Sequence, residues 1–89
     1  MPRIRFTANI QRHVPCPERE VRGETVREVL EDYFSQNQRA RGYVLDDQGS
    51  LRTHMLIFLN GETIRDRVRL SDAVQGDATL DVMQALSGG

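Results

Sequence analysis

Apolar and polar residues alternate along several short stretches of this chain, and along one longer stretch the apolar residues recur at helical spacing. Within Arg3–Asn9, the apolar residues Ile4, Phe6 and Ala8 alternate with polar ones, which predicts a half-buried strand. A proline-containing connection follows and predicts a loop. Arg19–Val21 is then predicted to be a short second strand that forms a hairpin with the first.

The clearest predicted element is a helix over Thr25–Asn37. Thr25 followed three residues later by Glu28 matches a capping box, in which each side chain satisfies a free backbone donor of the other residue. Acidic residues crowd the first half of this segment, where the helix dipole favours negative charge. The apolar residues form a single stripe that we expect to face the core: Val26, Val29, Leu30, Tyr33 and Phe34.

The second half of the chain predicts three more strands. A polar connection over Arg41–Thr53 is expected to be a mobile or functional loop. An apolar strand follows, and Asn60-Gly61 predicts a tight turn into a short return strand over Glu62–Ile64. Leu70–Val74 is predicted to form a turn of helix before the last strand, in which Leu80 and Val82 lie on one side and Asp81 and Met83 on the other.

This order of elements predicts an α+β domain in two layers. A four- to five-stranded sheet packs on one α-helix, and one helix covers one face of the sheet. In the strand "MLIFL", Met55, Ile57 and Leu59 share one face and Leu56 and Phe58 share the other. If the helix covers the first set, Leu56 and Phe58 point outward.

Two interpretations of the outward residues remain open. Either the Arg41–Thr53 connection folds over them, or they form a patch that binds a partner. Met83 lies on the outward side of the last strand and extends the patch, and methionine suits adaptable contacts. We favour the patch, although a shift of register by one residue would exchange the two faces.

Composition narrows the possible functions. The chain has 89 residues, 38% of them hydrophobic and 28% charged, with a net charge of −1. Such a chain is expected to be a globular protein of the cytoplasm, because it lacks a membrane-spanning run and a signal peptide. Positive charge is not concentrated, which argues against nucleic acid as a partner. No acid–base pair, activated nucleophile or phosphate-binding loop is apparent, so we do not expect an enzyme.

The cysteine and histidine residues do not predict a metal site. Cys16 is the only cysteine, and His13 and His54 bring the candidate ligands to three. A structural zinc site needs four. Cys16 is therefore interpreted as a loop residue or a small packed one. All 12 basic residues are arginine, so no side-chain amine is available for acylation.

The whole pattern resembles the ubiquitin-like β-grasp sulfur carriers of the MoaD/ThiS family. The resemblance covers nearly the whole chain, and it is carried by "GETVREVLEDYF", "IFLNGETI", "LSDAVQGDATLDV" and the terminal "SGG". It implies a ubiquitin-like β-grasp domain over residues 1–86 and a flexible reactive tail over residues 87–89. It also implies that Leu80 and Val82 face the core.

The resemblance further implies a chemistry for the end of the chain. A ubiquitin-activating-like enzyme uses ATP to adenylate the carboxylate of Gly89, and sulfur then displaces AMP to give a thiocarboxylate. The carrier itself binds no cofactor. Gly88 and Gly89 lack Cβ atoms and can thread a narrow channel. The residues expected to contact partner enzymes are Leu56, Phe58, Met83, Leu86 and Ser87.

Several partners and fates fit this resemblance. The sulfur-accepting enzyme would belong to the biosynthesis of cysteine, of molybdopterin or of a related metabolite, and the sequence looks most like the cysteine-biosynthesis carriers. The alternatives are a protein modifier conjugated through Gly89 and the small subunit of molybdopterin synthase. The free carrier is expected to be a monomer.

Overall fold

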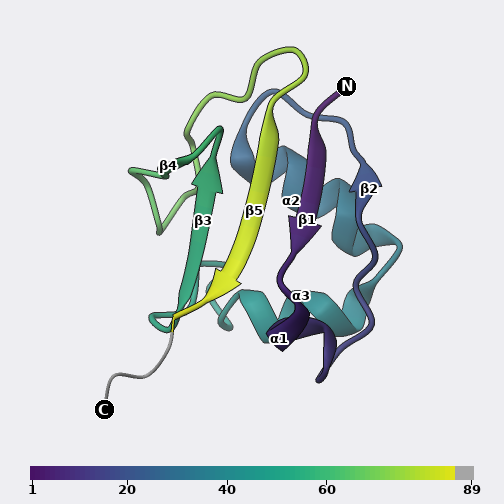
Figure 1. Ribbon diagram of the computed structural model, residues 1–89. Coiled ribbons are helices and arrows are strands. Elements are labelled where there is room, and N and C mark those ends of the chain that lie inside the picture. The colour runs from purple at the N-terminus through teal and green to yellow at the C-terminus, as the bar shows by residue number, and fades with distance from the viewer. Residues whose placement is uncertain (86–89) are drawn as a thin grey trace.

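The computed structural model describes residues 1–85, and Leu86–Gly89 lie outside the described residues. Its strands form a mixed sheet in the order β2-β1-β5-β3-β4. In Figure 1 the sheet faces the viewer and α2 crosses behind it, so the predicted two-layer α+β architecture is confirmed. The strands are β1 (Arg3–Phe6), β2 (Arg19–Glu20), β3 (Met55–Leu59), β4 (Glu62–Thr63) and β5 (Thr79–Gln84). The helices are α1 (Ala8–Gln11), α2 (Val26–Ser35) and α3 (Gln38–Val44).

β5 occupies the middle of the sheet. It runs parallel to β1, with Ile4 opposite Leu80, and antiparallel to β3, with Ile57 opposite Val82. The outer pairs, β1–β2 and β3–β4, are antiparallel. The first and last strands in sequence are therefore neighbours at the centre of the fold (Figure 1).

α2 forms where the sequence predicts it. The side chain of Thr25 accepts a hydrogen bond from the N–H of Glu28 at 3.2 Å, which satisfies one of the free donors of the first turn. The carboxylate of Glu28 reaches back to the N–H of Glu24 at 2.9 Å, one residue before the expected Thr25. The predicted apolar stripe is buried along its full length.

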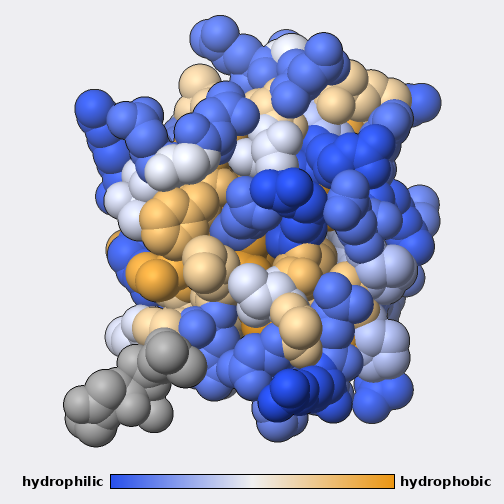
Figure 2. Space-filling view, viewed as in Figure 1, coloured by the Kyte–Doolittle hydropathy of each residue, from blue (hydrophilic) through white to orange (hydrophobic). Residues whose placement is uncertain are grey.

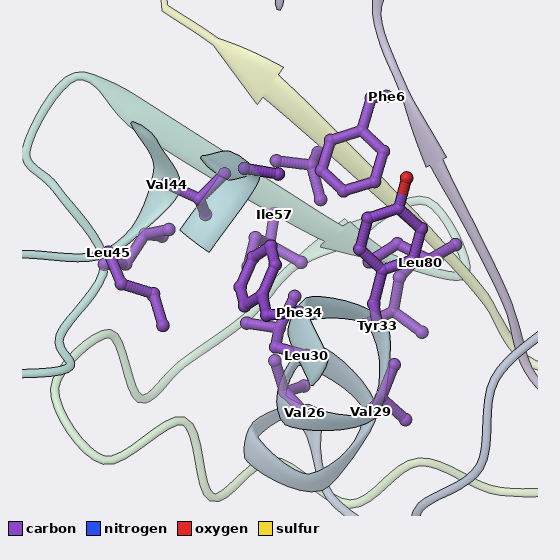
Figure 3. Packing of buried hydrophobic residues seen from close by; sticks show 14 of the residues in the cluster. Phe6, Val26, Val29, Leu30, Tyr33, Phe34, Val44, Leu45, Ile57 and Leu80 are labelled. Carbon is purple, nitrogen blue, oxygen red and sulfur yellow. The ribbon is translucent and has the colours of Figure 1, made fainter. Parts of the chain in front are cut away.

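The core lies between α2 and the inner face of the sheet, and Figure 3 shows it from close by. Met55, Ile57, Leu80 and Val82 are all at most 1% exposed, as predicted for the helix-facing side of β3 and β5. Tyr33 is buried as well, and its hydroxyl donates to the carbonyl of Pro17 at 2.8 Å. The core is therefore apolar, and this buried hydroxyl has its hydrogen bond.

The predicted first strand was too long. β1 ends at Phe6, and the chain turns into α1, where the strand was expected to continue to Asn9. The turn of helix carries Ile10 into the core, where it is 0% exposed. Burial of this side chain outweighs the alternating pattern before it.

The expected polar connection contains a helix. Asn37 caps α3 by accepting a hydrogen bond from the N–H of Ala40, and Ala40 and Val44 lie buried at helical spacing. The predicted helix over Thr25–Asn37 ends at Asn37, and the role of this residue as a second cap was not recognised from the sequence. What remains of the Arg41–Thr53 connection is a short turn closed by a bridge between Leu45 and Leu51.

The turn of helix predicted over Leu70–Val74 is absent from the structure of residues 1–85. The segment is irregular, with Leu70 at a φ of 58°, and the carbonyls of Leu70 and Asp72 accept hydrogen bonds from the N–H groups of Arg27 and Val26 at 2.8 and 3.0 Å. These are free donors at the start of α2. The segment thus serves as a cap for α2, a task that an internally bonded helix does not perform.

Candidate functional site

The face of the sheet opposite α2 carries three apolar side chains on two neighbouring strands, β3 and β5. Leu56 and Phe58 alternate with the buried residues of β3, and Met83 alternates with those of β5; all three are half-buried. Leu56 lies opposite Met83, and Phe58 lies opposite Asp81. Facing pairs in neighbouring strands have Cβ atoms about 5 Å apart. We call Leu56, Phe58 and Met83 the apolar face.

Figure 2 shows this side of the molecule with apolar residues gathered over β3 and the adjoining part of β5 and hydrophilic residues around them. The connection that could have covered the face packs elsewhere. Leu45 and Leu51 belong to the same buried cluster as Ile57, on the side of α2. The structure therefore agrees with an outward patch, and its role in binding a partner stays a prediction.

A charged pair borders the apolar face. The guanidinium of Arg5 donates two hydrogen bonds to the carboxylate of Asp81, at 2.7 and 3.0 Å. These hydrogen bonds and the negative charge of Asp81 raise the pKa of Arg5. Exposed pairs of this kind add little stability. Their place beside Phe58 gives the surface an apolar centre with a polar rim, which is typical of protein interfaces.

The predicted hairpin turn after β3 is confirmed. Asn60 and Gly61 both have positive φ angles, 51° and 87°, as a two-residue turn of this type requires. The side-chain carbonyl of Asn60 also accepts a hydrogen bond from the N–H of Thr79 at 2.9 Å. The turn thereby fixes the start of β5 against the end of β3 and aligns the strands of the apolar face.

Gly88 and Gly89, predicted to form the reactive end, lie outside the described residues, as do Leu86 and Ser87, predicted to contact partner enzymes. The last described residue is Ala85, whose N–H donates to the carbonyl of His54 at 2.7 Å. Met83 is two residues earlier. Met83 of the apolar face is therefore five residues before Gly88 in the sequence.

The side chains that hold the end of β5 were not predicted from the sequence. Gln84 accepts hydrogen bonds from the hydroxyl of Tyr43 at 2.8 Å and from the side-chain amide of Asn9 at 3.4 Å. The ring of Tyr43 stacks on that of His13, with centroids 5.7 Å apart. These residues come from three distant segments, and both α1 and α3 went unrecognised, so no sequence signal joined them.

Cys16 is a packed residue with an unreactive thiol. It is 0% exposed, and its S–H donates to the carbonyl of Val14 at 3.2 Å. Burial raises its pKa to about 11, which keeps it a neutral thiol near pH 7. Within residues 1–85, no three His, Cys, Asp or Glu side chains come together in a way that could hold a metal ion. The helices of this part of the chain are also too short or too polar to cross a membrane.

Three solved structures illustrate the likeness of the fold. CysO from Mycobacterium tuberculosis has a TM-score of 0.81 at 17% identity, with 97% of this chain and 100% of that chain covered. SAMP1 from Haloferax volcanii has a TM-score of 0.78 at 23% identity, with 99% and 98% covered. A chain of the BexX/CysO complex from Amycolatopsis orientalis has a TM-score of 0.77 at 23% identity, with both chains fully covered at 100%. The predicted ubiquitin-like β-grasp fold is thus confirmed.

No curated protein matches the sequence. A family model does match, and it does so from the first strand through the last residue. The matching family is described as the ThiS family, and the match covers residues 4–89. The chain, with its β-grasp sheet, its outward apolar face and its Gly88-Gly89 ending, therefore belongs to the ThiS family of ubiquitin-like sulfur carrier proteins.

Proposed function

We propose that this protein carries sulfur as a thiocarboxylate on Gly89 and delivers it to a biosynthetic enzyme. The observation that supports the proposal most directly is the family match, which runs through residue 89 and so includes both terminal glycines. The structural neighbours are small proteins of the same fold and similar length. The chain is thus proposed to act as a co-substrate of other enzymes.

The proposed chemistry begins with activation of a poor electrophile. A carboxylate does not lose oxide, so a partner enzyme first joins an oxygen of the Gly89 carboxylate to the α-phosphorus of ATP, and pyrophosphate leaves. A sulfide or persulfide sulfur then attacks the carbonyl carbon, and AMP leaves with its oxygen. If the donor is a persulfide, a thiol then attacks the donor's sulfur in the acyl disulfide, so that a new disulfide forms and the thiocarboxylate leaves. ATP is bound by the partner and not by this chain.

The proposed contact with the partner enzymes uses the apolar face. Ordering a chain segment costs about 1–2 kcal/mol per residue, so binding energy must come from the folded domain. Apolar residues at the centre of a contact, ringed by polar ones, supply most of the affinity in protein interfaces. Leu56, Phe58 and Met83 have this arrangement, and Leu86 and Ser87 are proposed to extend the contact toward the reactive end.

A second fate of the same activated carboxylate is conjugation to an amine of another protein. The likeness in fold to SAMP1, whose name describes a small archaeal modifier protein, favours testing it. Because this chain has no lysine, it cannot form chains linked through its own side-chain amines. We propose that the sulfur-accepting enzyme belongs to cysteine biosynthesis. The alternative is molybdopterin biosynthesis, in which the chain would be the small subunit of molybdopterin synthase.

Intact mass spectrometry tests the proposal. We expect incubation with the activating enzyme, ATP and a sulfur source to raise the mass by the difference between one sulfur and one oxygen atom. Fragmentation should place the change on Gly89. If a competent enzyme leaves the mass unchanged, the carrier proposal is wrong. If instead the chain appears joined to lysines of other proteins through Gly89, it is a modifier.

A variant without Gly89 is the matched control. It keeps the apolar face and every described residue, so we expect it still to bind the activating enzyme. It should nevertheless gain no sulfur, because the carboxylate of Gly88 falls one residue short of the active site. Conversion of this variant at the wild-type rate would contradict the assignment of Gly89 as the reactive residue.

A further inference from the structure

The end of β5 needs support that the sheet alone does not supply. On the β1 side of β5, the last paired residues are Phe6 and Val82. The final hydrogen bond between the two segments runs from the N–H of Thr7 to the carbonyl of Val82 at 3.2 Å. Beyond Val82, β3 is the only strand that pairs with β5 among the described residues. A strand end bonded on one side opens more readily than a strand bonded on both.

Side chains take over where β1 stops. The Tyr43 hydroxyl and the Asn9 amide both donate to the side-chain oxygen of Gln84, at 2.8 and 3.4 Å. Tyr43 is itself held, because its ring stacks on His13 with an interplanar angle of 20° and packs against the core. We call Asn9, His13, Tyr43 and Gln84 the strand-end clamp.

The backbone secures the opposite side of the same residues. Gln84 lies opposite Met55 in the β3–β5 ladder, and the N–H of Ala85 donates to the carbonyl of His54 at 2.7 Å. Ala85 is therefore held by its main chain to His54, just before β3, and Gln84 is held to α1 and α3 by its side chain. The last described residues of the chain are fixed from both sides.

We infer that the strand-end clamp positions the C-terminal carboxylate, with Tyr43 as its key positioning residue. The inference rests on the proposed function. Four residues follow Ala85, and they span at most about 14 Å when fully extended. The place of Ala85 consequently decides which points the Gly89 carboxylate can reach once the apolar face has docked. If Gln84 and Ala85 lose these hydrogen bonds, the strand end gains conformational entropy, and this entropy must be lost again before the carboxylate can react.

The substitution Tyr43→Phe tests the clamp, because it removes one hydroxyl and keeps the ring that stacks on His13. We expect the N–H of Ala85 to exchange with solvent about 3- to 10-fold faster, the effect of one hydrogen bond. With the activating enzyme, we expect kcat for thiocarboxylate formation to fall by about the same factor. The KM for the carrier should not change, because the apolar face is intact.

Tyr33→Phe is the matched control. It makes the same chemical change and also removes one hydrogen bond, from the hydroxyl to the carbonyl of Pro17, away from the end of β5. It should lower the melting temperature without changing kcat. Gln84→Leu should reproduce the effect of Tyr43→Phe, and the double variant should be no worse than either, as expected for two partners of one interaction.

The outcomes separate the two proposals. If Tyr43→Phe leaves both the Ala85 exchange rate and kcat at wild-type values, the clamp has no positioning role. If kcat falls equally in Tyr33→Phe, the loss reflects stability alone and the inference is also wrong. If the wild-type protein gains no sulfur, the proposed function fails, and the exchange rates alone decide whether the clamp exists.

Discussion

Asp66 shows how a single side chain shapes the segment between β4 and β5. Its carboxylate accepts hydrogen bonds from the hydroxyl of Ser71 and from the N–H groups of Val68, Arg69 and Ser71. These bonds favour the charged form, the Ser71 hydroxyl most, and they lower the pKa from its ordinary 3.8 to about 2. The carboxylate thereby supplies a partner to three backbone N–H groups of this irregular segment.

A pH-dependent loss of stability follows from this lowered pKa. Because the folded state binds the proton less tightly than the unfolded state, the charged Asp66 stabilises the fold fully above pH 3.8, and the stabilisation is lost as pH falls through about 2. We expect Asp66→Asn to lower the urea midpoint at pH 7. The difference from wild type should shrink steadily between pH 4 and pH 2.

The exposed Asp47 supplies a control for that experiment. Asp47→Asn makes the same change of charge in a turn and should leave the urea midpoint near its wild-type value at every pH. A constant difference between Asp66→Asn and wild type from pH 7 to pH 2 would show that the carboxylate charge of Asp66 does not stabilise the folded state.

At the scale of elements, the start of α2 depends on a cap that the sequence predicted. Thr25→Ala removes the oxygen that accepts from the N–H of Glu28. We expect the free energy of unfolding to fall by about 1 kcal/mol, as measured by urea denaturation. Thr53→Ala, at an exposed position outside any helix, should change it by less than about 0.5 kcal/mol. Equal effects of the two substitutions would contradict the capping role.

Elements with strong periodicity were predictable, and elements created by packing were not. Three elements have a local sequence pattern of their own, and each forms where that pattern predicts it: α2, β3 and the turn at Asn60–Gly61. α1 is a single turn that carries Ile10 into the core, a contact with distant residues that local spacing does not report. α3 does carry local signals, the cap at Asn37 and the helical spacing of Ala40 and Val44, and these went unrecognised.

The same distinction applies to the candidate site. Alternation along β3 and β5 was enough to predict that Leu56, Phe58 and Met83 share a face, because strand periodicity is local. The strand-end clamp was not predictable, since Tyr43 and Asn9 meet Gln84 only in the folded chain. The reactivity of Gly88 and Gly89 is predicted from the resemblance alone, and both lie outside the described residues.

At the scale of the whole molecule, the proposed docking role of the apolar face can be tested separately from folding. We expect Phe58→Arg to weaken binding to the activating enzyme by about tenfold or more, which corresponds to about 1.4 kcal/mol. The free energy of unfolding should change by less than about 1 kcal/mol, because the side chain projects from the face opposite the core. Titration calorimetry and urea denaturation measure the two effects.

Gln38→Arg is the control for charge, because it introduces the same side chain at an exposed position on α3. It should affect neither binding nor stability. If Phe58→Arg unfolds the domain, Phe58 belongs to the core. If it binds the enzyme as well as wild type does, the partner uses another surface.

Because β5 lies at the centre of the sheet, the domain can fold only if the chain extends through β5. β5 is the last strand in sequence among the described residues, yet it separates β1 from β3 and pairs with both. A chain that breaks off before Thr79 would expose two unpaired strand edges and would lack Met83. Truncated copies, which also lack the terminal glycines, therefore cannot complete the sheet or present a finished docking surface. Unpaired edges invite aggregation or degradation, so we expect such incomplete copies to be lost from the folded population.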